Sequence, residues 1–221
     1  MSASVPSTPA DTGALRQMIR RLERPMALGQ TPVSFGDAVL DGILPWGGLP
    51  TGALHEVSGP GALGFALAIA GRAPGRVMRI APPGGPLLYG PGLARFALTP
   101  RRLILADAKR GPALLWALEE ALKSKALGSV IVQGADPDLT ETRRLQLAAE
   151  AGGSLALLIR DGGAASSALT RWHVTPAPAS ADGAIRWTLD LLRCRGGRPR
   201  RLLVEWQDEA LCFHLVSPLG N

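Results

Sequence analysis

Short apolar runs alternate with stretches of helical periodicity along the middle of the chain. The runs ALHEVSG (53–59), RVMRIAP (76–82), RLILADA (102–108), SVIVQ (129–133) and SLALLIR (154–160) have the length and the apolar content of strands. Strands that are apolar on both faces and separated by helices indicate a largely parallel sheet covered on both sides. The pattern therefore predicts an α/β fold.

Helix signals lie between these runs. A helix is expected to start within 64–71, and a short one is expected near 35–43. Gly111 and Pro112 open a longer helix, since proline in the first helical turn costs no hydrogen bond. Its leucines at positions 114, 115, 118 and 122 form one stripe. Asp138 and Glu141 have the spacing of a capping box for the helix that follows.

The last forty residues change to strict alternation, which is typical of an antiparallel strand pair with one buried face. The turns CRGGRPR and QDEA separate three such segments. The apolar positions are Ile185, Trp187, Leu189 and Leu191, then Leu202, Val204 and Trp206, then Leu211, Phe213 and Leu215. A β-hairpin or meander is expected to finish one edge of the sheet.

The first fifty residues divide into three parts. Residues 1–11 are too polar to pack and are expected to be a disordered tail. Residues 12–24 predict an amphipathic helix, with Leu15, Met18, Ile19 and Leu22 on one face and Arg16, Arg20 and Arg21 elsewhere on its surface. A linker then leads to a core domain expected to span 51–221.

Composition narrows the class of protein. A chain of 221 residues with 46% hydrophobic content can bury one sizeable core. No apolar run approaches the roughly 18 residues of a membrane span, and the start of the chain lacks the order of a secretory signal. We therefore expect a soluble, cytoplasmic protein with reduced thiols at Cys194 and Cys212. The net charge of +6 comes almost entirely from arginine, which a GC-rich genome favours in any case, so it is a weak argument for nucleic acid.

The stretch EVSGPGALGFA (56–66) has the G-x-x-x-x-G spacing of a phosphate-binding P-loop, directly after a predicted strand. The two glycines of this spacing are Gly59 and Gly64. In a working P-loop the second glycine is followed by Lys and then by Ser or Thr, but here it is followed by Phe65 and Ala66. Lys reaches the terminal phosphates and Ser or Thr holds Mg²⁺. Losing the lysine's charge-assisted hydrogen bonds, worth about 1.5–3 kcal/mol, weakens triphosphate binding by about one to two powers of ten.

The ends of two predicted strands also lack the carboxylates of a working P-loop site. The strand ending at Gln133 and Gly134 offers no aspartate for Mg²⁺, and the strand before Pro82 offers no catalytic glutamate. We expect no hydrolysis, no catalytic residue, no metal site and no cofactor. Whether the loop is a degenerate nucleotide site or a plain strand-to-helix turn stays open, because the bare spacing is a weak signal.

Other candidates are modest. The histidines at 55, 173 and 214 share no spacing that suggests a metal site or a triad, and the tryptophans at 46, 116, 172, 187 and 206 suit core or interface packing. Arginines surround the Gly196–Gly197 turn at positions 193, 195, 198, 200 and 201. This concentration is either a solvated turn or a contact for phosphate or an acidic partner.

Longer segments resemble known families. GGLPTGALHEVSGP (47–60) resembles the approach to the P-loop in RecA-type recombinases. The segments LWALEEALKS, DLTETRRLQLAAEAG, TPAPASADGAIRWTLDLLRCRGGRP and LLVEWQDEA resemble the ImuA family of RecA-like mutagenesis accessory proteins. The resemblance covers about residues 12–216, and RCRGGRP followed by EW is its most distinctive part.

The resemblance implies a RecA-like core and a part in the SOS response to DNA damage. Family members act with ImuB, a Y-family polymerase relative, with a RecA-type recombinase and with an error-prone replicative-type polymerase in mutagenic translesion synthesis. Arg193 and Arg195 are similar in position to the RecA lysine pair that touches a neighbour's ATP, while Arg198 and Arg200 extend the same interface candidate.

The chain departs from RecA in its connections after the fourth and fifth strands, QGADPD and RDGGAASS, which are short and carry no basic residue beyond Arg160. RecA-style DNA binding is therefore not expected, and DNA would be reached through partners. The expectation is a non-catalytic adaptor. The alternatives are a SulA-like division inhibitor, a divergent ATP-binding protein and a direct DNA binder.

Overall fold

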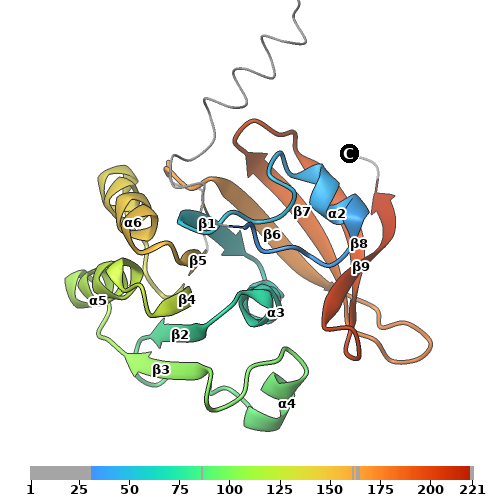
Figure 1. Cartoon of the computed structure of the whole chain (residues 1–221), viewed down its shortest axis with the longest axis horizontal. Helices are drawn as coiled ribbons and strands as arrows, with labels where there is room; N and C mark the ends of the chain where they lie inside the picture. The colour runs from blue at the N-terminus through green and yellow to red at the C-terminus, as the bar shows by residue number, and fades with distance from the viewer. Residues whose placement is uncertain (1–30, 86, 161, 163–164, 220–221) are drawn as a thin grey trace, which may run out of the picture.

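A nine-stranded sheet runs through the residues that the computed structural model describes, which are 31–85, 87–160, 162 and 165–219 (Figure 1). The strand order is β3-β2-β4-β5-β1-β6-β7-β8-β9. The strands are β1 Ala53–Ser58, β2 Arg76–Ala81, β3 Leu103–Asp107, β4 Leu127–Gln133, β5 Leu155–Ile159, β6 Thr170–Ala177, β7 Arg186–Cys194, β8 Arg200–Gln207 and β9 Cys212–Leu219.

The sheet has a parallel part and an antiparallel part. From β3 to β6 every neighbouring pair is parallel, and from β6 to β9 every pair is antiparallel. The antiparallel strands form a meander at one edge, with Trp187, Val204 and Phe213 buried on its inner face. The predicted α/β class and the antiparallel end of the sheet are confirmed.

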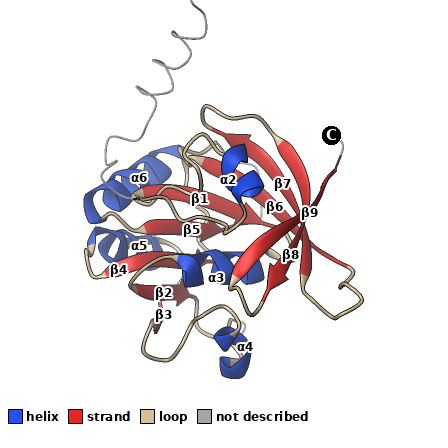
Figure 2. Ribbon diagram, turned by 45° about the vertical axis from the view of Figure 1, so that its right-hand side comes forward, coloured by secondary structure: helices blue, strands red, loops and turns tan. Residues whose placement is uncertain are grey.

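Helices cover the parallel part on both faces (Figure 2). The helices are α2 Ala38–Ile43, α3 Ala62–Arg72, α4 Gly90–Ala94, α5 Pro112–Lys123 and α6 Leu139–Gly152. Residues of α2, α3 and α4 share one apolar core with the inner face of the meander, and residues of α5 and α6 share the other. Among the described residues, no helix is both long enough and apolar enough to cross a membrane.

Local sequence explains most of the boundaries. Asp138 caps α6 in a full capping box with Glu141, as predicted, and Pro112 occupies the first turn of α5. The helix expected over 64–71 is α3, which begins slightly earlier, at Ala62. The sequence pattern did not predict α4, whose Gly90-Pro91-Gly92 start disfavours a helix.

Part of the N-terminal prediction falls outside the described residues. The tail at 1–11 and the amphipathic helix expected at 12–24, with Arg16, Arg20 and Arg21, are in the range 1–30. The described chain enters the fold through Val33, whose backbone pairs with Leu49. Asp37 then caps α2 by accepting from the amides of Val39 and Leu40.

His55 of β1 lies at the centre of a fully buried polar chain. Its Nε2 is 2.9 Å from the carbonyl of Pro50, which can only accept, so Nε2 carries the proton. Its Nδ1 therefore accepts from the Thr170 hydroxyl at 2.8 Å, and the oxygen of that hydroxyl accepts from the Trp172 indole at 2.9 Å. Burial lowers the pKa of His55 to about 4, against the opposing effect of the bond to Pro50. His55 is therefore a neutral structural residue.

This network predicts a pH dependence of stability. The folded pKa of His55 lies below its unfolded value of about 6.5, so the unfolded chain binds the proton more readily as the pH falls. The contribution of His55 to the free energy of unfolding is fully present above pH 6.5, and about 3 kcal/mol is lost between pH 6.5 and pH 4. Urea unfolding at pH 7 and pH 4 should show this loss in the wild type and not in His55→Gln. The exposed His214→Gln variant, used as a control, should keep it, and an unchanged loss in His55→Gln would refute the assignment.

Candidate functional site

The glycine-rich turn at 59–64 connects β1 to α3 and lies against the neighbouring strands β6 and β7. Its Gly61 amide donates to the carbonyl of Val174 at 2.9 Å. A Cβ at Gly61 would come within 2.7 Å of Val174 Cγ1 and 3.0 Å of Trp187 Cδ1, and one at Gly64 within 3.3 Å of the same indole. Side chains of β6 and β7 thus occupy the space above the turn, where a phosphate cradle needs open backbone amides.

The helix that follows closes the turn further. Because α3 begins at Ala62, the Ala62 amide donates to Gly59 O at 3.0 Å and the Phe65 amide donates to Gly61 O at 3.0 Å. Position 59 requires glycine for two reasons. Its φ is positive, at 89°, and a Cβ there would meet the carbonyl of Val174 at 2.6 Å. The amides of Gly61, Ala62 and Phe65 are therefore bound within the protein.

Phe65 and Ala66 are both completely buried. The Phe65 ring lies in an aromatic cluster, with its centroid 5.6 Å from that of Phe213, 5.8 Å from that of Trp172 and 6.4 Å from that of Phe35. The two positions that hold phosphate and Mg²⁺ in a working P-loop here supply core packing. The cluster joins α3 to β6, β9 and the segment before α2.

At the carboxyl end of β4, a glutamine is held by the neighbouring strand β2. Gln133, where an aspartate would hold Mg²⁺, accepts two hydrogen bonds at its Oε1 from Arg79 of β2, at 2.8 Å from Nε and 2.6 Å from Nη2. Burial lowers the pKa of the Arg79 guanidinium, which nearby Asp107 partly offsets. In the described part of the chain no three His, Cys, Asp or Glu side chains gather where they could hold a metal ion.

A buried ionic network lies at the carboxyl ends of β1 and β5. Glu56 Oε2 is 2.7 Å from Arg171 Nε, and Glu56 Oε1 is 3.4 Å from Arg160 Nη1. Arg160 also contacts Asp136 at 2.6 Å and donates to the carbonyl of Pro137 at 3.0 Å. Sequence reasoning missed this network, although charged residues inside otherwise apolar strands were a signal for it.

The arginine-rich β7–β8 turn is well separated from the phosphate-loop position. Strand β7 runs antiparallel to β6, so Trp187 lies beside Gly64, whereas Arg195, directly after the end of β7, donates its amide to the carbonyl of Leu169. Arg193 donates to the carbonyl of Ser166 at 2.8 Å. Arg195, Arg198 and Arg200 are exposed, and none of the described acidic side chains forms an ion pair with them. The turn at 59–64 and the arginine-rich β7–β8 turn therefore do not form one site.

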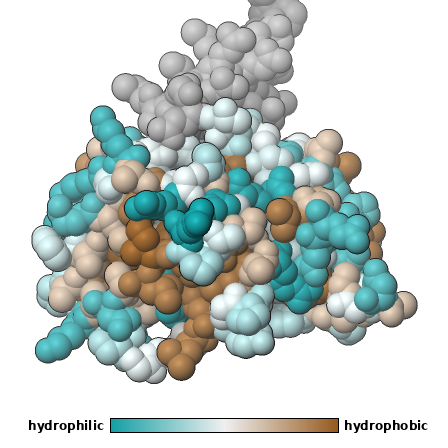
Figure 3. All heavy atoms as spheres, turned by 60° about the horizontal axis from the view of Figure 1, so that its bottom comes forward, coloured by the Kyte–Doolittle hydropathy of each residue, from teal (hydrophilic) through white to brown (hydrophobic). Residues whose placement is uncertain are grey.

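Apolar side chains are exposed beside the edge strand β3. Leu105 is 59% exposed, and Leu87 and Tyr89, in the connection before β3, are more so. Figure 3, which brings this side of the molecule forward, shows hydrophobic side chains gathered on it. Such a patch is typical of an interaction surface.

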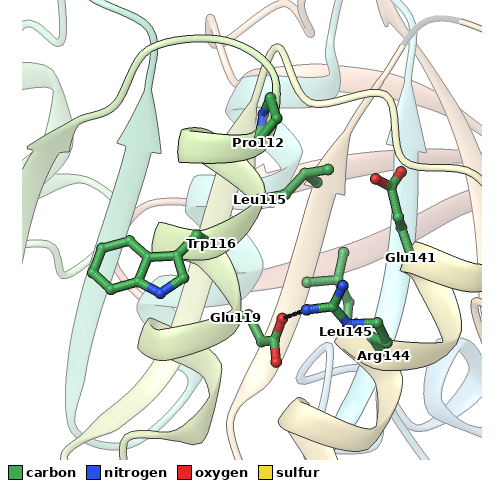
Figure 4. A pocket seen from close by; sticks show the side chains of 7 residues that line it. All are labelled: Pro112, Leu115, Trp116, Glu119, Glu141, Arg144 and Leu145. Atoms are coloured by element: carbon green, nitrogen blue, oxygen red, sulfur yellow. Dashed lines mark hydrogen bonds and ion pairs between the residues drawn. The ribbon is translucent and has the colours of Figure 1, made fainter.

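A small cavity of about 240 Å³ lies between α5 and α6. Figure 4 shows the Trp116 indole pointing away from α5 and Arg144 reaching across the cavity to Glu119. Trp116 is 67% exposed, so it does not pack in the core, and the interface role that the sequence also allows stays a prediction for this residue. Trp172, Trp187 and Trp206 are buried as expected.

Comparison with known proteins gives one clear result. No protein-family model matches the chain. Two curated proteins, both named Protein ImuA and both from Caulobacter vibrioides (strains NA1000 / CB15N and ATCC 19089 / CIP 103742 / CB 15), are each 34% identical to it over 225 residues. The match covers 86% of this chain and 91% of each relative.

Proposed function

This chain belongs to the ImuA family, and we propose on that basis that it is a non-catalytic adaptor in SOS-induced DNA damage tolerance. In this proposal a RecA-like core supports error-prone translesion synthesis in the cytoplasm. Its partners are an ImuB-type Y-family polymerase relative, a RecA-type recombinase and an error-prone replicative-type polymerase. DNA is reached through these partners.

The observation that carries the non-catalytic part is the closed turn at 59–64. The Gly61 amide donates to the carbonyl of Val174, Phe65 is part of the core, and Gln133 accepts hydrogen bonds from Arg79. A phosphoryl-transfer site needs amides, a cation and Mg²⁺ ligands directed at the phosphates. Around this turn the described residues place no lysine and no Mg²⁺ ligand, and the amides of Gly61, Ala62 and Phe65 are bonded within the protein, which supports a scaffold role for the loop.

Two kinds of surface support the adaptor part. The exposed apolar side chains near β3 suit contact with another protein. The exposed Arg195, Arg198 and Arg200 suit an acidic partner surface. We propose that the basic, amphipathic segment at 12–24 adds a further contact through Arg16, Arg20 and Arg21.

The test removes that segment. Deletion of residues 1–24, or the double charge reversal Arg20→Glu and Arg21→Glu, should abolish capture of an ImuB-type partner while the unfolding midpoint of the core stays unchanged. The measurement is a pull-down with purified partner, paired with thermal unfolding. The matched control is Lys123→Glu together with Lys125→Glu, which alters exposed cations at the end of α5. Capture that survives both N-terminal changes would contradict the proposed contact.

Other outcomes separate the alternatives. Filamentation of cells on overexpression without DNA damage would favour a SulA-like division inhibitor. A steep salt dependence of single-strand affinity, lost on Arg198→Gln, would favour direct DNA binding by the β7–β8 turn. ATP binding that requires Mg²⁺ would favour a divergent ATP-binding protein.

A further inference from the structure

The strands β2 and β4 are neighbours whose outgoing connections turn to opposite faces of the sheet. After β2 the chain passes to α4, whose Leu93 belongs to the same core as α3, and after β4 it passes to α6, whose Leu145 belongs to the other core. Connections that separate in this way leave a crevice at the carboxyl ends of the two strands, which is where ligands of open α/β sheets bind.

A cavity of about 450 Å³ lies in this crevice, within the usual size range of small-molecule pockets. It is bounded by the residues that end β2, β4 and β5 and by Arg110, which precedes α5. It does not include the turn at 59–64. The charged residues that line it are Arg79, Arg110, Arg160 and Asp136.

Three arginines therefore line one cavity, Arg79 from β2, Arg160 directly after β5 and Arg110 from the segment before α5. Arg79 and Arg160 are nearly buried, at 7% and 5% exposure, whereas Arg110 is exposed and donates to the carbonyl of Gly134 at 3.1 Å. Gly134, with φ of 76°, allows this approach, because a Cβ there would lie 2.7 Å from Arg110 Nη1.

One side-chain donor of a residue that lines this cavity is buried and without an acceptor within the described part of the chain. Arg160 Nε is buried and has no hydrogen-bond partner there. A buried donor that lacks an acceptor costs free energy, and an oxyanion would satisfy it.

We propose that this cavity binds the terminal phosphate of a phosphomonoester. Guanidinium forks match phosphate oxygens in pairs, and with three arginines and one aspartate the lining is net positive. Because Arg79 and Arg160 lie deep, a protruding terminal group reaches them, while an internal phosphodiester, flanked by two sugars, does not. The two sources of such a group are a free nucleotide and a phosphorylated strand end.

This site is independent of the proposed adaptor function and differs from ATP binding at a P-loop. Its phosphate ligands are arginines, so binding needs no Mg²⁺. Asp136 contacts Arg160 at 2.6 Å and competes with an incoming phosphate for it. Removal of that carboxylate should therefore strengthen binding.

The experiment titrates the full chain, without Mg²⁺, with inorganic phosphate, with adenosine 5′-monophosphate and with a short single-stranded oligonucleotide carrying either a 5′-phosphate or a 5′-hydroxyl. Binding is followed by calorimetry and by the amide signals of Gly134 and Ala135. We expect saturable binding of the phosphomonoesters, weakened about tenfold or more by Arg110→Gln and strengthened several-fold by Asp136→Asn. Arg198→Gln, at the other arginine-rich surface, is the matched control and should change nothing.

The oligonucleotide arms distinguish the sources. Preference for the 5′-phosphorylated strand over adenosine 5′-monophosphate would identify a strand end as the ligand, and the reverse order would identify a free nucleotide. Equal binding of the 5′-hydroxyl strand would overturn the terminal-phosphate assignment. Absence of binding by any probe, or equal effects of Arg110→Gln and Arg198→Gln in folded protein, would overturn the site.

Discussion

Replacing Glu56 with alanine is expected to lower the free energy of unfolding by about 3–5 kcal/mol. The reason is that the side chains of Glu56 and Arg160 are each only 2% exposed. Buried charges are tolerated when they are paired, but removal of Glu56 leaves the buried Arg160 with Asp136, a largely exposed carboxylate, and takes from Arg171 its partner at 2.7 Å. Chemical denaturation of the wild type and of Glu56→Ala at pH 7 measures the loss.

Two variants distinguish this explanation from a general effect of losing an ion pair. Asp208→Ala removes the partner of Arg95, an exposed pair at 2.6 Å, and should cost at most about 1 kcal/mol. The double replacement Glu56→Leu with Arg160→Met should cost less than Glu56→Ala alone, because neither buried charge remains. If Glu56→Ala costs no more than Asp208→Ala, the network contributes nothing as a buried pair.

Restoring the lysine of the P-loop is expected to damage the protein and not to revive nucleotide binding. Phe65→Lys removes a fully buried ring from contact with Trp172 and Phe213. Loss of a large core side chain costs about 3–5 kcal/mol, and burial of an ammonium group adds to that cost. We expect a loss in this range or greater in chemical denaturation, with no Mg²⁺-dependent ATP binding gained.

The matched control is Phe65→Leu, which keeps an apolar side chain and should cost less. The Gly61 amide stays bonded to Val174 in both variants, so neither opens the turn to phosphate. A Phe65→Lys protein that is as stable as the wild type and binds ATP with Mg²⁺ would show that the turn is an accessible nucleotide site.

The sequence was informative where burial is set by local pattern. The run SVIVQ forms the interior strand β4 because its residues are covered on both faces, and Asp138 caps α6 because its partner Glu141 lies three residues away. The helix expected over 64–71 is also present, although α3 starts earlier, at Ala62. In the structure Gly61 makes a tight turn, and the helix begins at once.

Other features depend on contacts that no local pattern contains. Glu56 meets Arg160 and Arg171 only because β1 lies between β5 and β6, across sequence separations of 104 and 115 residues. Leu105 is exposed because β3 is an edge strand, a consequence of chain topology. Trp116 is part of α5 but does not lie on the buried face of this helix, which carries Leu114, Leu118 and Leu122.

The measurement that tests the central claim most directly is a calorimetric titration of the intact chain with a purified ImuB-type partner, with and without ATP and Mg²⁺. A non-catalytic adaptor predicts saturable binding with the same Kd, within about twofold, under both conditions. Absence of binding, or binding only when ATP and Mg²⁺ are present, would contradict it.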